Sequence, residues 1–165
     1  MRLFAAILPD PAVREALLAA QSILRDRGTG RFPPPEGLHL TLAFLGETED
    51  LEGAEAALEA VSSPGPFPLC TGGLGHFGDL WWAGTADSCP LETLALDLQT
   101  ALRARGFPIE DRPWQPHITL VRRWKGPDPE LQVPRAAMMV RSISLLRSDQ
   151  TAGGSVYTEV CRRFL

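Results

Sequence analysis

Two short segments of this sequence carry the same pair of residues that could transfer protons and hold an anion. Segment 39–42 reads His-Leu-Thr-Leu, and 78 positions later segment 117–120 reads His-Ile-Thr-Leu. Side chains alternate between the two faces of a strand, so the histidine and threonine of each segment share one face. An imidazole transfers protons near neutral pH, and a threonine hydroxyl donates a hydrogen bond to an anion. Two such pairs across a cleft would supply an acid, a base and two donors to a bound phosphate.

This set of groups suits the hydrolysis of a cyclic phosphodiester. One group must deprotonate water and another must protonate the departing ribose oxygen. We therefore predict His39 and His117 as the catalytic acid and base, in an order that the sequence leaves open. Thr41 and Thr119 are predicted to bind the substrate phosphate.

The sequence lacks the residue patterns of other common catalytic sites. There is no G-x-S-x-G nucleophile elbow, and no cysteine stands in a motif with a histidine. The chain has three histidines, and neither repeated segment has a carboxylate at metal-ligand spacing. We expect an enzyme that needs neither a metal nor another cofactor.

Hydrophobic periodicity and turn residues predict the elements that hold these segments. We expect strands near residues 2–8, 38–45, 67–74, 80–85, 115–123, 138–146 and 156–164, and helices near 12–27, 51–61 and 91–105. Asp10 and Pro11 cap the first helix, and a leucine stripe marks the third. This order predicts an α+β fold with an antiparallel sheet, formed by one domain over residues 1–165. The repeated segments predict two related halves.

Composition limits the class of partner. Sixteen basic and twenty acidic residues give a net charge of −4, which argues against wrapping a long polynucleotide and favours a grip on a short stretch. The N-terminal apolar run is too short for a secretory signal, and no later segment is long enough to span a bilayer. Three scattered cysteines indicate no disulfide framework. We expect a cytoplasmic monomer without membrane association.

Several segments together resemble a known family, the 2H phosphoesterases, and within it the bacterial and archaeal RNA 2',3'-cyclic phosphodiesterases, historically called 2'-5' RNA ligases. The resemblance rests on residues 1–4, 35–46, 116–122 and the C-terminal stretch 145–165. It implies a bilobal fold, in which two pseudo-symmetric lobes with antiparallel sheets line a central cleft and the helices lie outside. It also implies that RNA ends or nucleotides with a 2',3'-cyclic phosphate are opened to 2'-phosphates.

Four further positions bear on how the substrate would be held. The chain has Ala43 where many relatives place a basic residue, so charge for the phosphate must come from elsewhere. Arg122 matches a position that the family uses near the phosphate, although alternation from His117 points it to the opposite face unless a bulge turns it inward. Phe32 and His76 are candidates for contact with the terminal base, with packing or surface roles as the alternative.

Two rival functions remain open at this stage. The same groups would catalyse the reverse reaction, the joining of RNA ends through a 2'-5' linkage. A nucleotide-binding module without turnover is the other rival, although binding alone would not need two proton-transfer groups.

Overall fold

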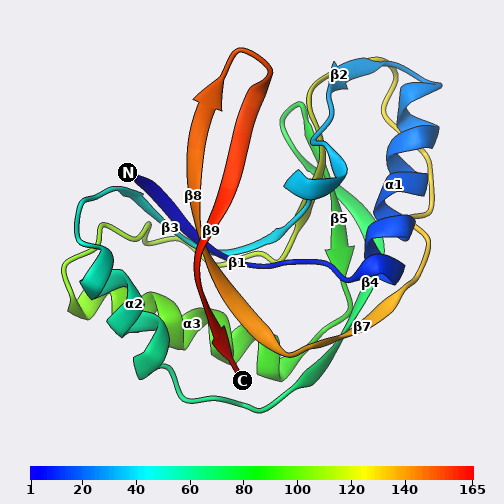
Figure 1. Ribbon diagram of the computed structural model, residues 1–165. Helices are drawn as coiled ribbons and strands as arrows, with labels where there is room; N and C mark the ends of the chain where they lie inside the picture. Colours follow the sequence, from blue (N-terminus) through cyan, green and yellow to red (C-terminus); the bar gives the residue numbers. More distant parts are fainter.

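The computed structural model describes residues 1–165 and is built from nine strands, three α-helices and one short 3-10 helix (Figure 1). The strands are β1 (Arg2–Ile7), β2 (Thr29–Arg31), β3 (Leu40–Glu47), β4 (Phe67–Phe77), β5 (Leu80–Thr85), β6 (Ile118–Lys125), β7 (Ala137–Val140), β8 (Ser142–Thr151) and β9 (Gly154–Phe164). The helices are α1 (Pro11–Arg25), α2 (Leu51–Ala60) and α3 (Cys89–Ala104), with the 3-10 helix at Pro35–Gly37.

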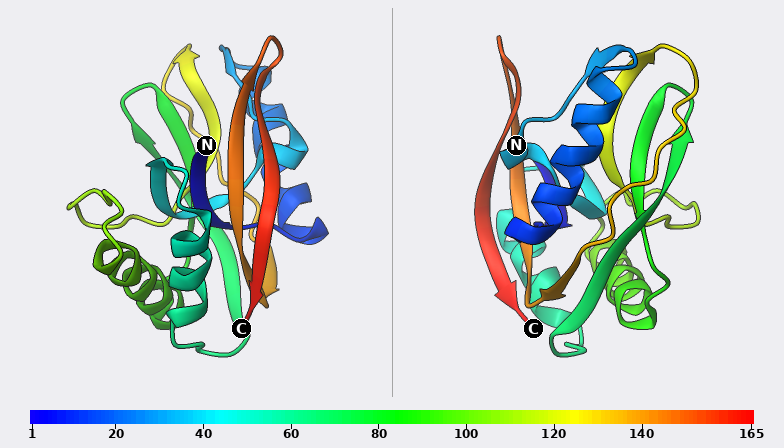
Figure 2. Two further views of the ribbon diagram at one scale, coloured as in Figure 1. Left: turned by 60° about the vertical axis from the view of Figure 1, so that its left-hand side comes forward. Right: turned by 90° about the vertical axis from the view of Figure 1, so that its right-hand side faces the viewer.

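The strands form one antiparallel sheet that divides into two lobes. Its order is β7-β4-β5-β6-β3-β1-β8-β9, and β2 pairs with β6. The two central strands, β3 and β6, meet at a single residue pair, Leu40 opposite Ile118. On either side of this junction the lobes diverge, as the separation of the β8–β9 hairpin from β4 and β5 shows (Figure 2). The predicted α+β class with antiparallel sheets in two lobes is confirmed.

The two halves are related by a constant offset in numbering, the one that separates His39 from His117. β1 and β5 cover residues 2–7 and 80–85, β3 and β6 cover 40–47 and 118–125, and α1 and α3 begin at 11 and 89. The helix caps obey the same offset: the Asp10 carboxylate accepts a hydrogen bond from the amide of Val13, and the Ser88 hydroxyl accepts one from that of Leu91. The repeat predicted from two tetrapeptides therefore extends over a whole strand–helix–strand unit.

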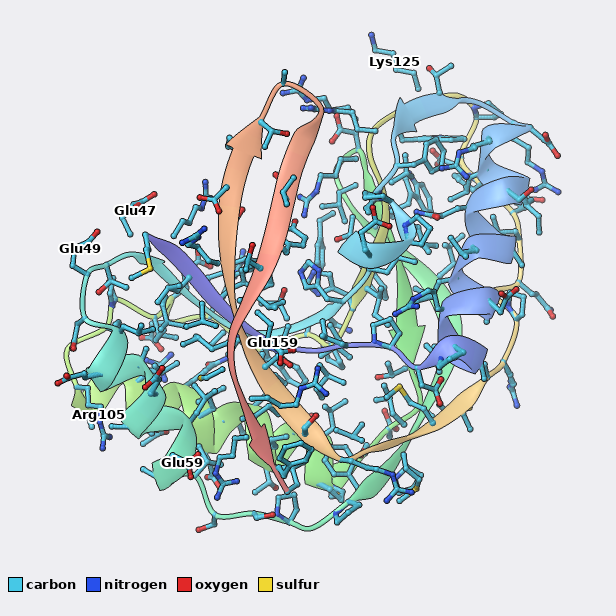
Figure 3. The ribbon with its side chains drawn as sticks, in the orientation of Figure 1. Glu47, Glu49, Glu59, Arg105, Lys125 and Glu159 are labelled. Atoms are coloured by element: carbon cyan, nitrogen blue, oxygen red, sulfur yellow. The ribbon has the colours of Figure 1, made fainter.

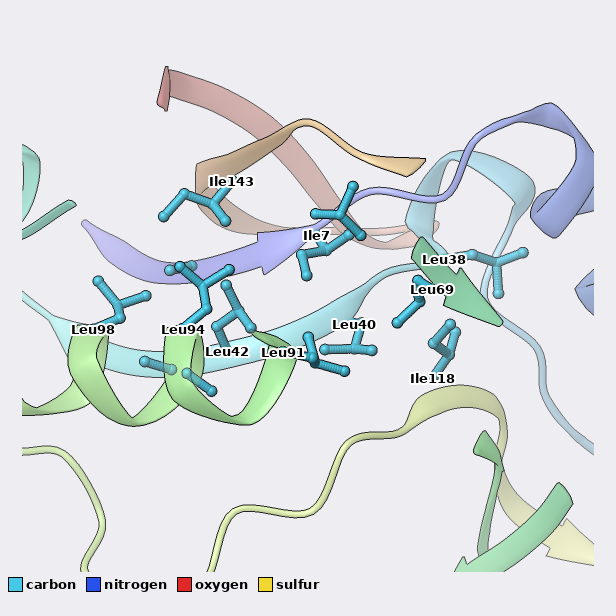
Figure 4. Packing of buried hydrophobic residues seen from close by; sticks show 14 of the residues in the cluster. Ile7, Leu38, Leu40, Leu42, Leu69, Leu91, Leu94, Leu98, Ile118 and Ile143 are labelled. Carbon is cyan, nitrogen blue, oxygen red and sulfur yellow. The ribbon is translucent and has the colours of Figure 1, made fainter. Parts of the chain in front are cut away.

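Each repeat places its helix on the strands of the other repeat. α1 follows β1 but packs against β6 and β7, whereas α3 follows β5 and packs against β3. In the second contact Leu91, Leu94 and Leu98 of α3 lie against Leu40 and Leu42 of β3 (Figure 4). A cluster of 35 buried residues includes side chains from both lobes. The lobes therefore share one core, which fixes the two motif strands relative to each other.

The predicted strand boundaries were wrong at the motifs. β3 and β6 begin at Leu40 and Ile118, immediately after His39 and His117, rather than at residues 38 and 115. Each imidazole instead contacts a backbone carbonyl two residues earlier, in the irregular segment before the strand.

Two other predicted segments also differ. The strand expected over residues 138–146 is interrupted at Arg141, because β7 pairs with β4 whereas β8 pairs with β1. His76 and Phe77, beyond the strand predicted near residues 67–74, belong to the end of β4, where they pair with Trp81 and Leu80 of β5.

Charged side chains gather at the periphery. Glu47, Glu49, Arg105 and Lys125 project outward from the ends of strands and helices (Figure 3). Lys125, the single lysine of the chain, lies at the far end of β6 from His117. None of the helices is long and apolar enough to cross a bilayer.

Candidate active site

The four residues of the repeated motifs meet at the junction of the lobes. Antiparallel pairing of Leu40 with Ile118, continued by one residue in each direction, sets Thr119 opposite His39 and His117 opposite Thr41. Residues on either side of a paired residue point to the opposite face, so all four side chains leave the sheet on the face away from Leu40 and Ile118. Each imidazole thus has the other repeat's threonine as its cross-strand neighbour.

Both imidazoles are oriented by the same kind of hydrogen bond. The Nδ1 atom of His39 lies 2.8 Å from the carbonyl oxygen of Gly37, and that of His117 lies 2.8 Å from the carbonyl oxygen of Gln115. A carbonyl oxygen only accepts, so each Nδ1 carries a proton and donates it. In the neutral ring this leaves the Nε2 lone pair free, so each histidine offers one nitrogen for proton transfer.

The surroundings of both histidines favour the uncharged form of the imidazole. The pKa of His39 is lowered to about 4, mainly by burial and to a smaller extent by the positive charge of Arg122. Burial followed by the charge of Arg122 also brings the pKa of His117 below its ordinary value of 6.5. The hydrogen bonds to Gly37 and Gln115 oppose these effects and raise each pKa, but they do not cancel the lowering.

Aromatic rings pack against both imidazoles. The rings of Phe4 and Tyr157 lie 4.8 and 5.2 Å from the imidazole of His39, and the contact with Tyr157 is edge-on. Phe77 meets His117 edge-on at 5.1 Å, with Trp82 at 6.1 Å. Phe4 and Trp82 are again equivalent positions of the two repeats.

Arg122 lies on the side of the histidines because β6 contains a bulge. The pairing of β5 with β6 places Trp81 opposite Val121 and Trp82 opposite Thr119, which leaves Leu120 out of the ladder. Leu120 and Val121 are both fully buried, so the alternation of side chains along β6 changes phase after the bulge. Arg122 therefore leaves the strand on the same face as His117 and Thr119. Its guanidinium lowers the pKa of both imidazoles, and the ion pairs of the structure involve other residues.

Comparison with known proteins agrees with this arrangement. The profile of the 2'-5' RNA ligase superfamily matches residues 9–152. The chain belongs to this superfamily. It is 34% identical, over 96% of its own length and 87% of the relative's, to the RNA 2',3'-cyclic phosphodiesterase of Thermus thermophilus. An Archaeoglobus fulgidus protein of the same name is 31% identical over 97% and 98% of the two chains.

A solved structure shows the same fold. Escherichia coli LigT complexed with 3'-AMP superposes with a TM-score of 0.88 and 28% identity, over 99% of this chain and 97% of that one. The resemblance drawn from the sequence segments is therefore confirmed at the level of family and fold.

In this superfamily member a cavity of about 510 Å³ opens beside His117 and Thr41. Two aromatic residues on its wall are largely open to solvent, Phe44 at 54% and Phe77 at 47% exposure. Trp114, also on the wall, donates a hydrogen bond of 3.1 Å from Nε1 to the carbonyl oxygen of Thr41. The volume falls within the range of small-molecule sites, and the exposed rings offer stacking surfaces.

The two residues predicted to contact the base lie outside this cavity. Phe32 is partly buried, and the guanidinium of Arg25 covers its ring at 4.5 Å. His76 stacks on Trp81 at 4.6 Å, and its Nδ1 lies 3.1 Å from the carbonyl oxygen of Gly78. Base contact by Phe32 or His76 stays a prediction, whereas Phe77, the neighbour of His76, lines the cavity.

Sequence reasoning did not place Phe4, Phe77 or Trp82 beside the imidazoles. A signal was available in the offset between the two motifs, which also aligns Phe4 with Trp82 and Phe44 with Arg122. The pairing of Tyr157 with His39 carried no local signal, because β9 reaches this region through its pairing with β8. No group of three His, Cys, Asp or Glu residues lies close enough to hold a metal ion.

Proposed function

We propose that this protein hydrolyses the 2',3'-cyclic phosphate ends of RNA or nucleotides to 2'-phosphomonoesters. The observation that carries the proposal is the junction of the lobes, where two imidazoles with free Nε2 atoms alternate with two threonines on one face. Relatives that align over nearly the whole chain bear the name of this activity, and E. coli LigT was solved with a nucleotide. Both observations support this substrate class.

In the proposed complex the cyclic phosphate lies between the two repeats. The hydroxyls of Thr41 and Thr119 donate hydrogen bonds to its non-bridging oxygens, and Arg122 adds a positive charge. Water attacks phosphorus, the new P–O bond forms, and the bond from phosphorus to the ribose O3' breaks. Negative charge grows on the phosphoryl oxygens during this step, so fixed donors and a cation lower its barrier.

Two proton transfers accompany the step. One imidazole accepts the proton of the attacking water at Nε2, and the other gives a proton from Nε2 to the departing O3'. The surroundings of both imidazoles favour their neutral form. The arrival of the anionic substrate favours protonation of the acid, since nearby negative charge raises the pKa of a histidine. The burial that lowers the pKa of His39 to about 4 makes it the harder of the two to protonate. We therefore assign His39 as the base and His117 as the acid.

The setting of the reaction follows from charge and composition. We infer a monomer that acts in the cytoplasm on the last few nucleotides of an RNA. A net charge of −4 does not favour a long anionic track, and the three unpaired cysteines suit a reducing compartment.

Product analysis tests the proposal. The protein is incubated with 2',3'-cyclic AMP, and separately with an RNA carrying a 2',3'-cyclic phosphate together with an RNA carrying a 5'-hydroxyl. The expected product is the 2'-phosphate in both reactions, with or without a strong chelator. Formation of 3'-AMP, or activity that chelation abolishes and zinc restores, would contradict the mechanism. Joined RNAs would favour the ligase reaction, and saturable binding without product would favour a binding module.

A further inference from the structure

Two buried glutamines make equivalent contacts with the two motif strands. Gln21 of α1 is fully buried, and its Nε2 donates hydrogen bonds of 3.0 Å each to the carbonyl oxygens of Leu120 and Pro33. Gln99 of α3 is 6% exposed, and its Nε2 donates a 2.9 Å hydrogen bond to the carbonyl oxygen of Leu42. These acceptors require a donor, which fixes the direction of each side-chain amide.

One acceptor of each glutamine, Leu120 for Gln21 and Leu42 for Gln99, is the carbonyl of a bulged residue. Pairing of β1 with β3 sets Ala5 opposite Ala43 and Ala6 opposite Thr41, so the ladder skips Leu42 just as the β5–β6 ladder skips Leu120. A bulge leaves its extra residue out of regular pairing, and a buried backbone group without a partner is costly. Each glutamine thus supplies a hydrogen-bond partner at the point where the strand departs from regular geometry.

The contacts cross from one repeat to the other. Gln21 precedes His39 by the same number of positions as Gln99 precedes His117, so the glutamines are equivalent positions of the two repeats. Gln21, however, contacts the strand that follows His117, and Gln99 contacts the strand that follows His39. None of the three hydrogen bonds involves an imidazole, and the bonds to Leu120 and Leu42 reach their strands at the third residue after the histidine. Gln99 also borders the cavity beside His117, so a readout on the histidines themselves is needed to separate positioning from substrate contact.

We propose that Gln21 and Gln99 are positioning residues, each of which holds the bulged motif strand of the opposite repeat and so places that repeat's imidazole and threonine. The consequence for turnover rests on the proposed function, whereas the structural effect on the histidines does not. Displacement of a catalytic group by about 1 Å costs up to roughly a hundredfold in rate. The bulge after each threonine also decides which side Arg122 and Phe44 take, so its loss would disturb both repeats' contacts with substrate.

The experiment compares Gln21→Met and Gln99→Met, which keep most of the side-chain volume and remove the donor. Leu24→Met and Leu102→Met are matched controls, since these leucines are fully buried on the same helices, one turn further along. NMR spectra of the imidazoles report placement without any need for activity, and kcat and KM on 2',3'-cyclic AMP report turnover.

A crossed pattern is expected. Gln21→Met should change the resonances of His117 more than those of His39, and Gln99→Met should do the reverse. Each should lower kcat by roughly tenfold to a hundredfold with KM changed by less than about threefold. The leucine controls should keep kcat within about twofold and show no such pattern.

Three results would overturn the proposal. The first is a glutamine variant that leaves the resonances of both histidines unchanged or shifts them equally. The second is a loss of turnover that the leucine controls reproduce, and the third is fast exchange of either glutamine's side-chain amide. If a methionine variant does not fold, hydrogen exchange of the side-chain amides in the unaltered protein decides. Slow exchange at both glutamines is expected, and fast exchange at either would refute its hydrogen bond. Crossed histidine shifts in a protein without turnover would uphold the positioning role and reject the proposed function alone.

Discussion

The two repeats share a scaffold but enclose their histidines differently. His39 packs against Phe4 and Tyr157, which also contact each other, whereas His117 lies beside Phe77 and borders the 510 Å³ cavity. Both repeats have strands with equivalent bounds and helix caps at equivalent positions. Both also have the hydrogen bond on Nδ1 and the bulge after the threonine. The duplicated features are therefore those that place an imidazole and a threonine, and the single-copy features are the side chains that surround them.

The clearest difference stands shortly after each bulge. There the first repeat has Phe44 and the second has Arg122, at equivalent positions. Phe44 presents a half-exposed ring to the cavity, and Arg122 presents a positive charge to both imidazoles. One scaffold therefore provides an apolar surface on one side and a cation on the other, which suits a ligand with a base at one end and a phosphate at the other.

Removal of either imidazole should have the largest effect and test whether the repeats contribute equally. We expect His39→Ala and His117→Ala each to lower kcat on 2',3'-cyclic AMP by on the order of 10²-fold or more, because both proton transfers are needed. Circular dichroism would confirm that each variant is folded. A folded variant of either kind with near-normal turnover would end the two-histidine mechanism.

The equivalent positions 44 and 122 should respond in different kinetic parameters. Arg122→Ala should lower kcat/KM by up to roughly a hundredfold, since a hydrogen bond to a charged group contributes about 1.5–3 kcal/mol. Phe44→Ala should act chiefly on KM, through lost stacking with the base. Lys125→Ala is the control, because this residue lies on the same strand but points into solvent (Figure 3). An equal loss from Lys125→Ala would show that Arg122 acts only through general charge.

The two threonines should be close to interchangeable. Thr41→Val and Thr119→Val keep the side-chain shape and remove one hydroxyl donor each, so we expect a loss on the order of tenfold in kcat for either. Steady-state kinetics of both single variants and the double variant would measure this. A tenfold loss from one and none from the other would mean that the phosphate is held by one repeat alone.

The smallest effect is expected in the pH dependence of kcat/KM. With the pKa of His39 lowered to about 4 and that of His117 lowered below 6.5, the base is neutral above about pH 4 and the acid is protonated only below its lowered pKa. The profile of kcat/KM, which reports the free enzyme, should therefore be bell-shaped with an alkaline limb below pH 6.5. Arg122→Ala should move both limbs to higher pH, since the cation that disfavours imidazolium is gone. An alkaline limb above pH 6.5 in the unaltered protein would contradict the burial argument.

Much of the scaffold could be predicted from local patterns. The helix near residues 91–105 followed from its leucine stripe, and the first helix from Asp10 and Pro11, because periodicity and caps are properties of neighbouring residues. The two histidines were selected because their segments repeat. Each of these signals is contained in the sequence itself, without knowledge of which strands pair.

What could not be predicted depends on pairing over long range. The bulges at Leu42 and Leu120 exist only relative to the neighbouring strands, so the direction of Arg122 stayed open in the sequence. The exchange of helices between repeats has no local signature either, and it is what brings Gln21 to the strand of His117. Aligning the chain with itself at the offset between the two motifs would have shown that Gln21 and Gln99 are equivalent, but not what they contact.

The central claim is that one anion is held between the two repeats and contacts both imidazoles. Its most direct test is an NMR pH titration of the three histidines with and without saturating sulfate, a tetrahedral anion that does not itself titrate in this range. The account predicts that the pKa values of His39 and His117 both rise when sulfate binds. At each pH, sulfate should leave the resonances of His76, outside the cavity, unchanged. A rise confined to one of the two, or none in either, would contradict a shared phosphate site.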